Sequence, residues 1–554
     1  MCGIAGIIEH SGDGDRGRLR AAVDRMADAL VHRGPDDAGT WVDERAGVAL
    51  GFRRLAILDL SERGHQPMES HDGRLVLIFN GEIYNHAELR AQLPTPWRGH
   101  SDTETLVEAL SAWGVDKTLP LLNGMFAFVA IDVEAGKAYV ARDPFGIKPV
   151  YYTHSGHGLQ FASEIRGLKE LRATARQKFS LDRDALQSFL SLRFVPSPAT
   201  LLREVRRVPP GHCLRCDIPS NTIEVTCYIR SEAKRFKGTL NEAVDQYHAL
   251  MGLAVRRNML SDVPVGILLS GGVDSAYVAA MAARVSKDTP CFSVGFGPGF
   301  AECELEAAGQ SARLLGLQVH PITVTHDELW SVFEPCIAAI EEPLGTTSVL
   351  PMWVLCQRTR EHVKVALTGQ GTDEPWGGYR RYQAELWRNL PLVPALSRLA
   401  HPVFNRLPGV PDAIARAVES LPVADRAERF EREYGLFSRS QRESLTGRPD
   451  FGHAVEGIRY WLAWSDSRAD LGAAERMMSI DSRMGLADDL LLYGDKVSMA
   501  HSLEARVPML DIELVRFVES LPSRFRVTLG KGKVAHKLAD RKSTRLNSSH
   551  VSES

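Results

Sequence analysis

The sequence lacks the features of membrane, exported and nucleic-acid-binding proteins. No apolar run approaches the ~20 residues that a membrane-spanning helix needs, and the N-terminus has neither the basic nor the apolar region of a signal peptide. The 66 Lys and Arg residues nearly balance the 69 Asp and Glu residues, so no excess of positive charge is available for nucleic acid or an anionic membrane. We therefore expect a cytoplasmic protein with neither nucleic acid nor a membrane as a partner.

Cysteine is scarce, with 8 in a chain of 554 residues. The cysteines are scattered, which favours reduced thiols over a disulfide framework. Cys213 and Cys216 have the CxxC spacing of some zinc sites, but no second pair of ligands follows at a suitable distance. The length exceeds what one hydrophobic core usually serves, so we expect two or more domains.

Composition along the chain predicts two domains of different class. Short apolar runs divided by Gly, Asn and Asp fill the first part of the chain, to about residue 165, and favour sheet-on-sheet packing with a few helices. Prolines crowd the segment from Val195 to Lys237, which indicates a connection between domains. From Leu240, strands and helices alternate, as in a doubly wound parallel sheet with helices on both faces.

We expect a first domain over residues 1–210, a connecting segment over 211–239, an α/β domain over 240–541 and a tail over 542–554. The tail reads KSTRLNSSHVSES, has no apolar periodicity and is expected to be disordered or foreign. A mostly helical region, broken by Pro391–Pro411, is expected from Tyr382 to Val507. The α/β domain has expected strands at 263–269, 291–296, 318–324 and 363–367, and expected helices at 240–260, 274–285, 302–315, 326–340 and 348–361.

Cys2 has a position that suits a nucleophile. If Met1 is removed, the Cys2 thiol lies beside a free α-amine, which can accept the thiol proton directly or through one water. The thiolate is the reactive form of cysteine, and a nearby proton acceptor or positive charge increases its fraction. The alternative is an early cysteine that only packs in the core. Position alone leaves both interpretations open.

Ser270-Gly271-Gly272-Val273-Asp274-Ser275 lies between an expected strand and an expected helix. Backbone N–H groups of such a turn converge on an anion, and the helix N-terminus adds a positive dipole end. Asp274 would hold Mg²⁺ bridged to phosphates. The loop is neither a Walker A sequence nor a GxGxxG loop, and an ordinary tight turn is the alternative.

A second Gly-rich loop, Thr368–Glu374, follows the expected strand at 363–367. Ligands of open α/β sheets bind at the carboxyl ends of the strands, so both loops should meet at one edge. Asp274 and Asp373 could then share one magnesium ion. A surface turn with solvated acidic residues is the alternative.

The N-terminal cysteine and the loops together resemble one known family. SGGVDS is similar to the pyrophosphate loop of the N-type ATP pyrophosphatases, and Cys2 joined to such a domain resembles the glutamine-dependent asparagine synthetases. The first half alone also fits other class II amidotransferases, but SGGVDS excludes the phosphoribosyl and sugar-phosphate members. Further matching segments, spread from residue 1 to about 541, are His32–Asp36, Arg54–Ile57, Phe79–Asn85, Ser101–Glu104, Gly124–Phe128, Arg142–Gly146, Ser293–Phe296, Gly377–Tyr379, Asp495–Lys496 and Glu504–Pro508.

The resemblance implies that the first domain is a glutaminase with an N-terminal-nucleophile fold, an αββα sandwich. Cys2 would attack the side-chain amide of glutamine, giving a thioester and ammonia. Asn80 and Gly81 would stabilise the oxyanion, although a hairpin turn is an alternative for this pair. The residues implied to hold glutamine are Arg54 for the α-carboxylate, Glu82 and Asp102 for the α-ammonium, and Asn80 and Gly81.

The resemblance also implies that ammonia passes through an interior channel to an ATP-dependent synthetase domain. There a carboxylate, by resemblance the β-carboxylate of aspartate, attacks the α-phosphate of ATP, and ammonia displaces AMP from the acyl-adenylate. Lys496 would lie near the phosphates, with a solvated helix lysine as the alternative, and Asp274 and Asp373 would bind Mg²⁺. The residues implied to bind ATP are Leu269, Ser270, Gly271, Gly272, Asp274, Ser275, Val294, Thr368 and Gly369.

Gln370 departs from the family pattern. The family has an acid there that is a candidate base for the incoming ammonium, and a glutamine cannot accept a proton at neutral pH. Either Glu374 or Glu342 would then act as the base, or the acceptor chemistry differs. Pro375–Trp376 replaces simpler residues, and the match stops near Arg541, which suggests a truncated or foreign C-terminus.

Three functions follow as hypotheses. The first is a glutamine-hydrolysing asparagine synthetase with glutamine, aspartate and ATP as substrates and Mg²⁺ as cofactor; a homodimer is considered. The second is an amidotransferase that acts on another carboxylic acid, which Gln370 keeps open. The third is a non-catalytic regulatory paralogue, against which Cys2, Asn80, Asp274 and Asp373 argue.

Overall fold

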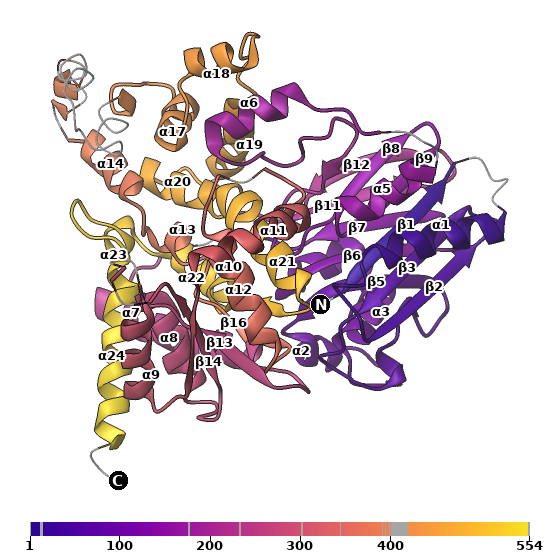
Figure 1. Ribbon diagram of the computed structural model, residues 1–554, viewed down its shortest axis with the longest axis horizontal. Helices are drawn as coiled ribbons and strands as arrows, with labels where there is room; N and C mark the ends of the chain where they lie inside the picture. Colours follow the sequence, from indigo (N-terminus) through magenta and orange to yellow (C-terminus); the bar gives the residue numbers. More distant parts are fainter. Residues whose placement is uncertain are drawn as a thin grey trace.

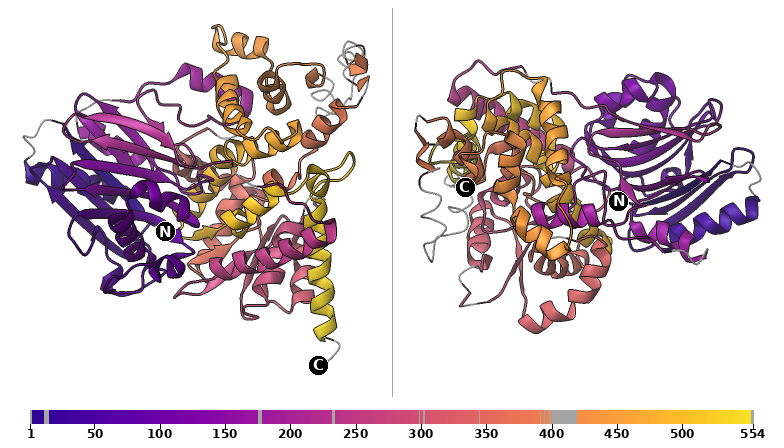
Figure 2. Two further views of the ribbon diagram at one scale, coloured as in Figure 1. Left: turned by 180° about the vertical axis from the view of Figure 1, so that it is seen from behind. Right: turned by 90° about the horizontal axis from the view of Figure 1, so that it is seen from above.

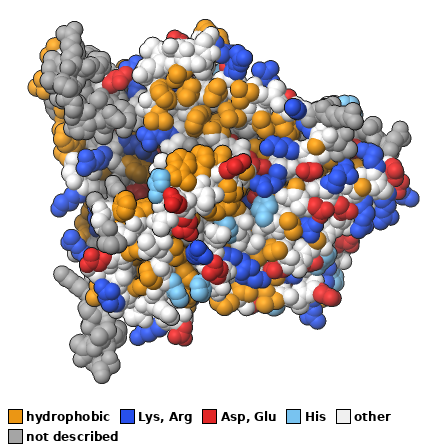
Figure 3. Space-filling view, in the orientation of Figure 1, with side chains coloured by type: hydrophobic (Ala, Val, Ile, Leu, Met, Phe, Trp, Pro, Cys, Tyr) orange, Lys and Arg blue, Asp and Glu red, His pale blue; other side chains and the backbone are white. Residues whose placement is uncertain are grey.

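The computed structural model shows two domains side by side, with the N-terminus at their junction (Figures 1 and 2). It describes residues 2–551 except 11–14, 175–177, 232–233, 298, 301–302, 344, 391, 394, 398 and 400–418. Positive and negative side chains are interspersed on the face seen in Figure 3, in keeping with the balanced composition. In the part of the chain that is described, no helix combines the length and apolar character needed to cross a bilayer.

The N-terminal domain is a sandwich of two antiparallel sheets, with strand orders β10-β8-β9-β1-β3-β2 and β12-β11-β7-β6-β5-β4. Helices α1 (Arg16–Asp28) and α5 (Ile165–Thr174) cover the first sheet, and α3 (Asp102–Trp113) covers the second. This arrangement confirms the expected αββα fold. The strands are β1 (Gly3–Glu9), β2 (Asp37–Asp43), β3 (Val48–Arg54), β4 (Met68–Glu69), β5 (Leu75–Ile83), β6 (Gly124–Asp132), β7 (Lys137–Arg142), β8 (Tyr151–Ser155), β9 (Gly158–Ala162), β10 (Arg206–Arg207), β11 (His212–Asp217) and β12 (Thr222–Cys227).

Side chains alternate between the two faces of each strand, and this alternation gives the domain two separate hydrophobic layers. In β5, Ile78 faces the opposing sheet, whereas Phe79 packs beneath α3. Successive side chains of a strand point to opposite faces, so a continuous apolar strand is buried on both sides. The same rule separates Cys213 and Cys216, which lie three positions apart on β11 and belong to different cores. This pair therefore cannot form the CxxC metal site.

The expected connecting segment 211–239 is wrong over most of its length. Strand β11 pairs with β7, and β12 pairs with β11, so both strands extend the second sheet. The prolines do not interrupt them, because Pro209 and Pro210 precede β11 and Pro219 lies in the turn between the strands. The N-terminal domain therefore reaches at least to Cys227.

The C-terminal domain contains a parallel sheet with the order β15-β14-β13-β16-β17. Separate hydrophobic clusters cover its two faces, which confirms the doubly wound α/β prediction. The strands are β13 (Val265–Leu268), β14 (Cys291–Gly295), β15 (Val319–Thr323), β16 (Val365–Leu367) and β17 (Glu504–Arg506), and the helices of the alternating region are α7 (Leu240–Asn258), α8 (Val273–Ala282), α9 (Leu305–Leu315), α10 (His326–Ser331), α11 (Phe333–Ile340) and α12 (Val349–Arg360).

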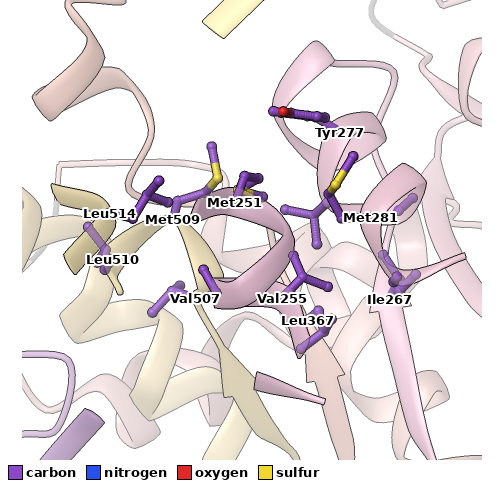
Figure 4. Packing of buried hydrophobic residues seen from close by; sticks show 14 of the residues in the cluster. Met251, Val255, Ile267, Tyr277, Met281, Leu367, Val507, Met509, Leu510 and Leu514 are labelled. Carbon is purple, nitrogen blue, oxygen red and sulfur yellow. The ribbon is translucent and has the colours of Figure 1, made fainter. Parts of the chain in front are cut away.

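One face of this sheet packs against α7. Met251 and Val255 of that helix lie over Ile267 of β13 and Leu367 of β16 (Figure 4). The packing holds β13 and β16 side by side, and each strand leads directly into one Gly-rich loop. The core therefore fixes the base of both loops.

Further helices complete the C-terminal domain. They are α14 (Arg380–Arg388), α17 (Arg426–Tyr434), α18 (Arg439–Thr446), α19 (His453–Asp466), α20 (Ala473–Asp481), α21 (Leu491–Ala500) and α22 (Ile512–Ser520). Most of the expected break at Pro391–Pro411 lies outside the described residues.

The C-terminal helix α24 (Val534–Val551) packs against α7 and α8. Where a disordered or foreign tail was expected, the backbone of residues 542–551 continues α24 as a helix, and 552–554 lie outside the described residues. The physical reason is propagation: Ala535 and Ala539 bury the first turns of the helix in the core, and extending a formed helix costs less than starting one.

Candidate active sites

Cys2 lies directly before β1 and is almost completely buried, with 8% of its surface exposed. Its backbone N–H donates to Asn80 Oδ1 at 2.8 Å. A cavity of about 30 Å³ adjoins the thiol, and its lining includes all the residues implied to hold glutamine except Asn80. The lining residues are Cys2, Arg54, Leu55, Ile57, Leu58, Gly64, Gln66, Phe79, Gly81, Glu82, Ser101, Asp102 and Thr103.

Asn80 and Gly81 lie inside β5, so the hairpin alternative is wrong. Among the described residues, Asn80 Nδ2 has no hydrogen-bond partner although it is buried. Gly81 leaves room for close strand contact, because a Cβ there would lie 2.1 Å from the Met125 carbonyl oxygen. Buried donors are rarely left unsatisfied without a reason. An unpartnered amide beside a thiol suits an oxyanion that forms during reaction.

The charged residues of this pocket contact the protein itself. The Arg54 guanidinium donates to the Ser61 carbonyl oxygen at 3.0 Å and to Asp59 O. Asp102, in the first turn of α3, accepts from the Ile83 N–H at 2.8 Å. Burial raises the pKa of the Asp102 carboxyl to about 6, although its two backbone N–H partners oppose the shift.

Glu82 contacts the other domain. Its Oε1 lies 3.2 Å from a guanidinium nitrogen of Arg506 in β17. Burial raises the pKa of the Glu82 carboxyl well above its ordinary value, while Arg506 acts against that shift. The Arg506 backbone oxygen also accepts from the N–H of Thr368, in the second Gly-rich loop. One residue of β17 therefore touches both predicted sites.

Burial dominates the titration of Cys2. It raises the pKa of the thiol, whereas the backbone N–H of Leu55 and the Arg54 charge lower it. A buried thiol with a raised pKa needs a dedicated proton acceptor before it can attack. The α-amine of a chain that begins at Cys2 would supply one.

Arg33 joins Cys2 to the C-terminal domain, a role that sequence reasoning missed. This buried guanidinium donates to the Cys2 carbonyl oxygen at 3.2 Å, to Glu164 at 2.7 Å and to Asp495 of α21 at 2.9 Å. The segments His32–Asp36 and Asp495–Lys496 carried the signal, since both belong to the matched motifs. Neither motif by itself indicates that Arg33 and Asp495 are hydrogen-bonded to each other.

A second cavity, of about 360 Å³, lies at the carboxyl ends of β13, β14 and β16. Nearly all the residues implied to bind ATP line it, and Gly271 lies beside it with its N–H donating to Glu304 at 3.0 Å. The volume is in the range of small-molecule sites. The lining residues are Leu268, Leu269, Ser270, Gly272, Asp274, Ser275, Val294, Glu304, Leu355, Thr368, Gly369, Gln370, Gly371, Asp373, Glu374, Tyr379, Leu490 and Tyr493.

The two Gly-rich loops touch each other. Ser270 Oγ and Ser275 Oγ are 2.8 Å apart, and the Gly272 N–H donates to Ser270 Oγ at 3.2 Å. A Cβ on Gly369 would lie 2.6 Å from the backbone nitrogen of Ser275. The first loop leads into α8, whose N-terminus adds the positive end of a helix dipole. This arrangement suits a phosphate group.

Asp274 and Asp373 approach one common point. The Lys533 ammonium lies 2.6 Å from Asp274 Oδ2 and 2.7 Å from Asp373 Oδ1. Burial acts in the opposite direction, but His536 and Lys533 hold the pKa of the Asp274 carboxyl below its ordinary value. Two carboxylates that share one cation fit Mg²⁺, which usually takes one or two carboxylates and completes its shell with phosphates and water. Within the described chain, no cluster of three or more His, Cys, Asp or Glu residues suits a metal.

Of the two expected bases, only Glu374 lines the second cavity. It accepts from the Tyr379 hydroxyl at 2.7 Å, and its buried Oε2 has no hydrogen-bond partner among the described residues. Burial raises the pKa of Glu374 to about 7, and the Tyr379 hydrogen bond acts against that shift. Glu342 instead accepts from Tyr151 in the N-terminal domain at 2.7 Å. A pKa near 7 suits proton transfer at physiological pH.

Lys496 does not line the second cavity, so its proximity to the phosphates stays a prediction. Its ammonium lies 2.5 Å from Glu341 Oε2 and 4.8 Å from the centre of the Tyr151 ring. A buried ammonium requires a charged partner, and Glu341 supplies it at the domain interface. The solvated-lysine alternative is also wrong, because Lys496 is buried.

An αββα domain with a buried cysteine directly before its first strand, joined to a parallel sheet with two Gly-rich loops at its carboxyl edge, is the architecture of a glutamine amidotransferase fused to an ATP-utilising domain. The chain belongs to the family of glutamine-hydrolysing asparagine synthetases. The profile described as a glutamine amidotransferase domain matches residues 1–229, and that described as asparagine synthase matches residues 246–542.

Curated relatives extend over almost the whole chain. Asparagine synthetase [glutamine-hydrolyzing] 1 of Bacillus subtilis is 31% identical, over 96% of this chain and 83% of its own length. Asparagine synthetase [glutamine-hydrolyzing] 2 of the same organism is 30% identical, over 96% of this chain and 68% of its own. Amidase chry2 of Gibberella zeae is 27% identical, over 95% of this chain and 83% of its own. Relatives of this similarity therefore carry more than one activity name.

Proposed function

We propose that this enzyme hydrolyses glutamine at Cys2 and transfers the ammonia to a carboxylate that ATP has activated. The observation that carries the proposal is the pairing of two complementary sites. The first has a thiol next to an unpartnered buried amide, Asn80 Nδ2. The second has two phosphate-type loops with Asp274 and Asp373 aimed at one cation.

In the first site, Cys2 Sγ would attack the amide carbon of glutamine after passing its proton to the α-amine. Asn80 Nδ2 would donate to the oxygen that becomes negative, which is worth roughly 10²–10³ in rate for one such donor. The carbon–nitrogen bond then breaks, ammonia leaves, and water hydrolyses the thioester to glutamate. Glutamine must displace some of the present contacts of Arg54 and Glu82 to be held by them.

In the second site, an acceptor carboxylate oxygen would attack the α-phosphorus of ATP while the bond to the pyrophosphate breaks. The backbone N–H groups of the Ser270–Ser275 loop would hold the phosphates. Mg²⁺ bound by Asp274 and Asp373 would offset phosphate charge. Ammonia then attacks the acyl carbon, AMP leaves, and Glu374 takes the proton from the attacking nitrogen.

Helix α21 supports transfer of ammonia between the two sites. Asp495 of this helix binds Arg33, which binds the carbonyl oxygen of Cys2. Tyr493, two residues earlier on α21, lines the ATP-type cavity. Ammonia would therefore travel alongside α21 within the domain interface.

Aspartate is the acceptor that we propose to test first, because relatives bear the name asparagine synthetase. A second candidate is a carboxylic acid with no second negative group. Gln370 replaces the usual acid, and within the described residues the cavity lining contains no Lys, Arg or His. Aspartate carries a second carboxylate, which normally requires a cationic partner.

Pyrophosphate release measured with ATP, Mg²⁺, glutamine and a panel of acids tests both candidates. Asparagine formed together with aspartate-dependent pyrophosphate supports aspartate as acceptor. Pyrophosphate release that depends on another acid would identify that acid as the acceptor. Glutamine hydrolysis without pyrophosphate release for any acid would refute the ATP half of the proposal and favour a regulatory paralogue.

A further inference from the structure

Helix α5 of the N-terminal domain receives its N-terminal cap from the other domain. The backbone N–H groups of Ile165 and Arg166 donate to the two carboxylate oxygens of Glu341, at 2.9 and 2.6 Å. Glu341 directly follows α11 in the C-terminal domain, 176 positions along the chain from Ile165. The first N–H groups of a helix have no partner within the helix, and a side chain just before the helix usually accepts from them. For α5, a distant residue of the second domain does so instead.

Glu164, which directly precedes α5, binds a different partner. Its carboxylate accepts from the Arg33 guanidinium at 2.7 Å. Arg33 in turn donates to the Cys2 carbonyl oxygen at 3.2 Å and to Asp495 at 2.9 Å. Because Glu341 caps the helix, the Glu164 side chain is available to hold the arginine that contacts the backbone of Cys2.

These contacts close a ring across the domain interface, where α11 and α21 lie side by side (Figure 1). The Lys496 ammonium lies 2.5 Å from Glu341 Oε2, and Lys496 follows Asp495 on α21. The charged side chains of the ring are at most 2% exposed, and a buried charge that loses its partner is strongly destabilising. In order, and with two steps through the backbone, the ring is Arg33, Glu164, Ile165, Glu341, Lys496 and Asp495.

The backbone of Glu341 is strained for a residue with a side chain. Its φ of +63° lies in the left-handed region, where helices commonly end in glycine. Such strain persists where the surrounding structure imposes it, and it clusters at functional positions. At Glu341, the surrounding structure is the pair of N–H groups and the ammonium that the carboxylate binds.

We propose that Glu341 is a positioning residue for ammonia transfer. By closing the ring it keeps Cys2 aligned with α21, so that ammonia released at Cys2 enters the second site before it reaches solvent. This inference rests on the proposed function, because it takes ammonia as the intermediate that the two sites share. Glu341 lines neither cavity, so the chemistry within each site does not require it.

An isotope competition tests the inference. The enzyme receives ATP, Mg²⁺, aspartate or the acid that supports pyrophosphate release, glutamine with ¹⁵N in its side-chain amide, and unlabelled ammonium chloride. Mass spectrometry gives the labelled fraction of the amide product, which should be high for the wild-type enzyme.

Glu341→Gln keeps the size of the side chain and removes the charge that holds the ring together. A hydrogen bond to a charged group is worth about 10- to 100-fold in an equilibrium constant. The ring should therefore open more often, and we expect the labelled fraction to fall by about fivefold or more. Glutamine hydrolysis alone, and amidation with saturating ammonium chloride alone, should each change by less than about threefold.

Glu341→Gly distinguishes this role from a purely structural one. Glycine suits the left-handed backbone, so a position that only ends a helix should tolerate it with thermal stability and labelled fraction unchanged or raised. We expect the labelled fraction to fall at least as far as in Glu341→Gln. Glu334→Gln, at an exposed position of α11, is the matched control and should leave the labelled fraction unchanged.

An unchanged labelled fraction in both Glu341 variants would overturn the inference alone. A loss of the two separate activities in parallel with the label would also overturn it, because Glu341 would then support the fold and not the transfer. A wild-type enzyme that hydrolyses glutamine while its product takes nitrogen only from the ammonium chloride would overturn the transfer step of the proposed function as well.

Discussion

The two candidate sites differ in size and in the charge of the side chains that line them. Beside Cys2, the cavity is about 30 Å³, Arg54 binds loop carbonyls, and Glu82 pairs with Arg506. Between the Gly-rich loops, the cavity is about 360 Å³, and Glu374 Oε2 has no partner in the described structure. The first site is small, and its Arg54 and Glu82 side chains are paired within the protein, whereas the second site is larger and the described part of its lining includes no Lys, Arg or His.

Each site therefore needs something different from its ligand. Glutamine must exchange existing contacts for its own, so binding at the first site should involve rearrangement of the 58–61 loop or of the Glu82–Arg506 pair. ATP must bring cations with it, so binding at the second site should depend on Mg²⁺. Because Arg506 contacts Glu82 and Thr368, rearrangement at one site can reach the other.

Cys2→Ala should give the largest effect and should separate the activity of the first site from that of the second. We expect glutamine-dependent amidation to fall by about 10⁴-fold or more, because no other group replaces the nucleophile. Amidation with added ammonium chloride should continue at a similar rate. AMP release measured with each nitrogen source checks this, with exposed Cys227→Ala as the control. Surviving glutamine-dependent turnover would show that the nucleophile lies elsewhere.

Glu374→Gln should damage only the second site. Removing a general base costs typically about 10²–10⁴-fold, and this loss should apply equally with glutamine and with ammonia. Because a base acts in its deprotonated form and the pKa of Glu374 is about 7, the wild-type amidation rate should rise with pH and level off above that value. The variant should lose this rise. Glu306→Gln, on the exposed part of α9, is the control.

The second site could be predicted because topology places it. Each Gly-rich loop follows a strand of a parallel sheet, and β13 and β16 are neighbours. Carboxyl ends of neighbouring parallel strands meet at one edge, so Asp274 and Asp373 converge as expected. The alternation of strands and helices that predicted the sheet is a local pattern, readable without distant contacts.

Long-range partners could not be predicted in the same way. Arg506 belongs to a strand of three residues, and the two charged residues at its ends give no apolar signal. Lys496 was placed near the phosphates by resemblance, but its partner Glu341 is 155 positions away. Strands β11 and β12 were hidden by prolines that lie only in the turns around them. Pairing across such distances is decided by tertiary packing.

Asn80 variants sharpen the description of the first site. Asn80→Ala should lower kcat for glutamine hydrolysis by about 10²–10³-fold, as expected for one oxyanion donor. Asn80→Asp keeps an acceptor for the Cys2 N–H but replaces the unpartnered Nδ2 donor by oxygen. It should therefore lose at least as much activity. Retention of glutaminase activity by the aspartate variant would mean that Asn80 only positions Cys2.

Tyr379→Phe should give the smallest effect and test how the second site sets the pKa of Glu374. The Tyr379 hydroxyl donates to Glu374 at 2.7 Å and lowers its pKa against the effect of burial. Loss of this hydrogen bond should move the pH profile of amidation upward by about one unit, equivalent to roughly 1.4 kcal/mol. The rate at high pH should recover, because Glu374 still ionises there. Tyr382→Phe, whose hydroxyl donates to Asp481 instead, should leave the profile in place. A shift of both profiles would mean that packing, and not the hydrogen bond to Glu374, controls the titration.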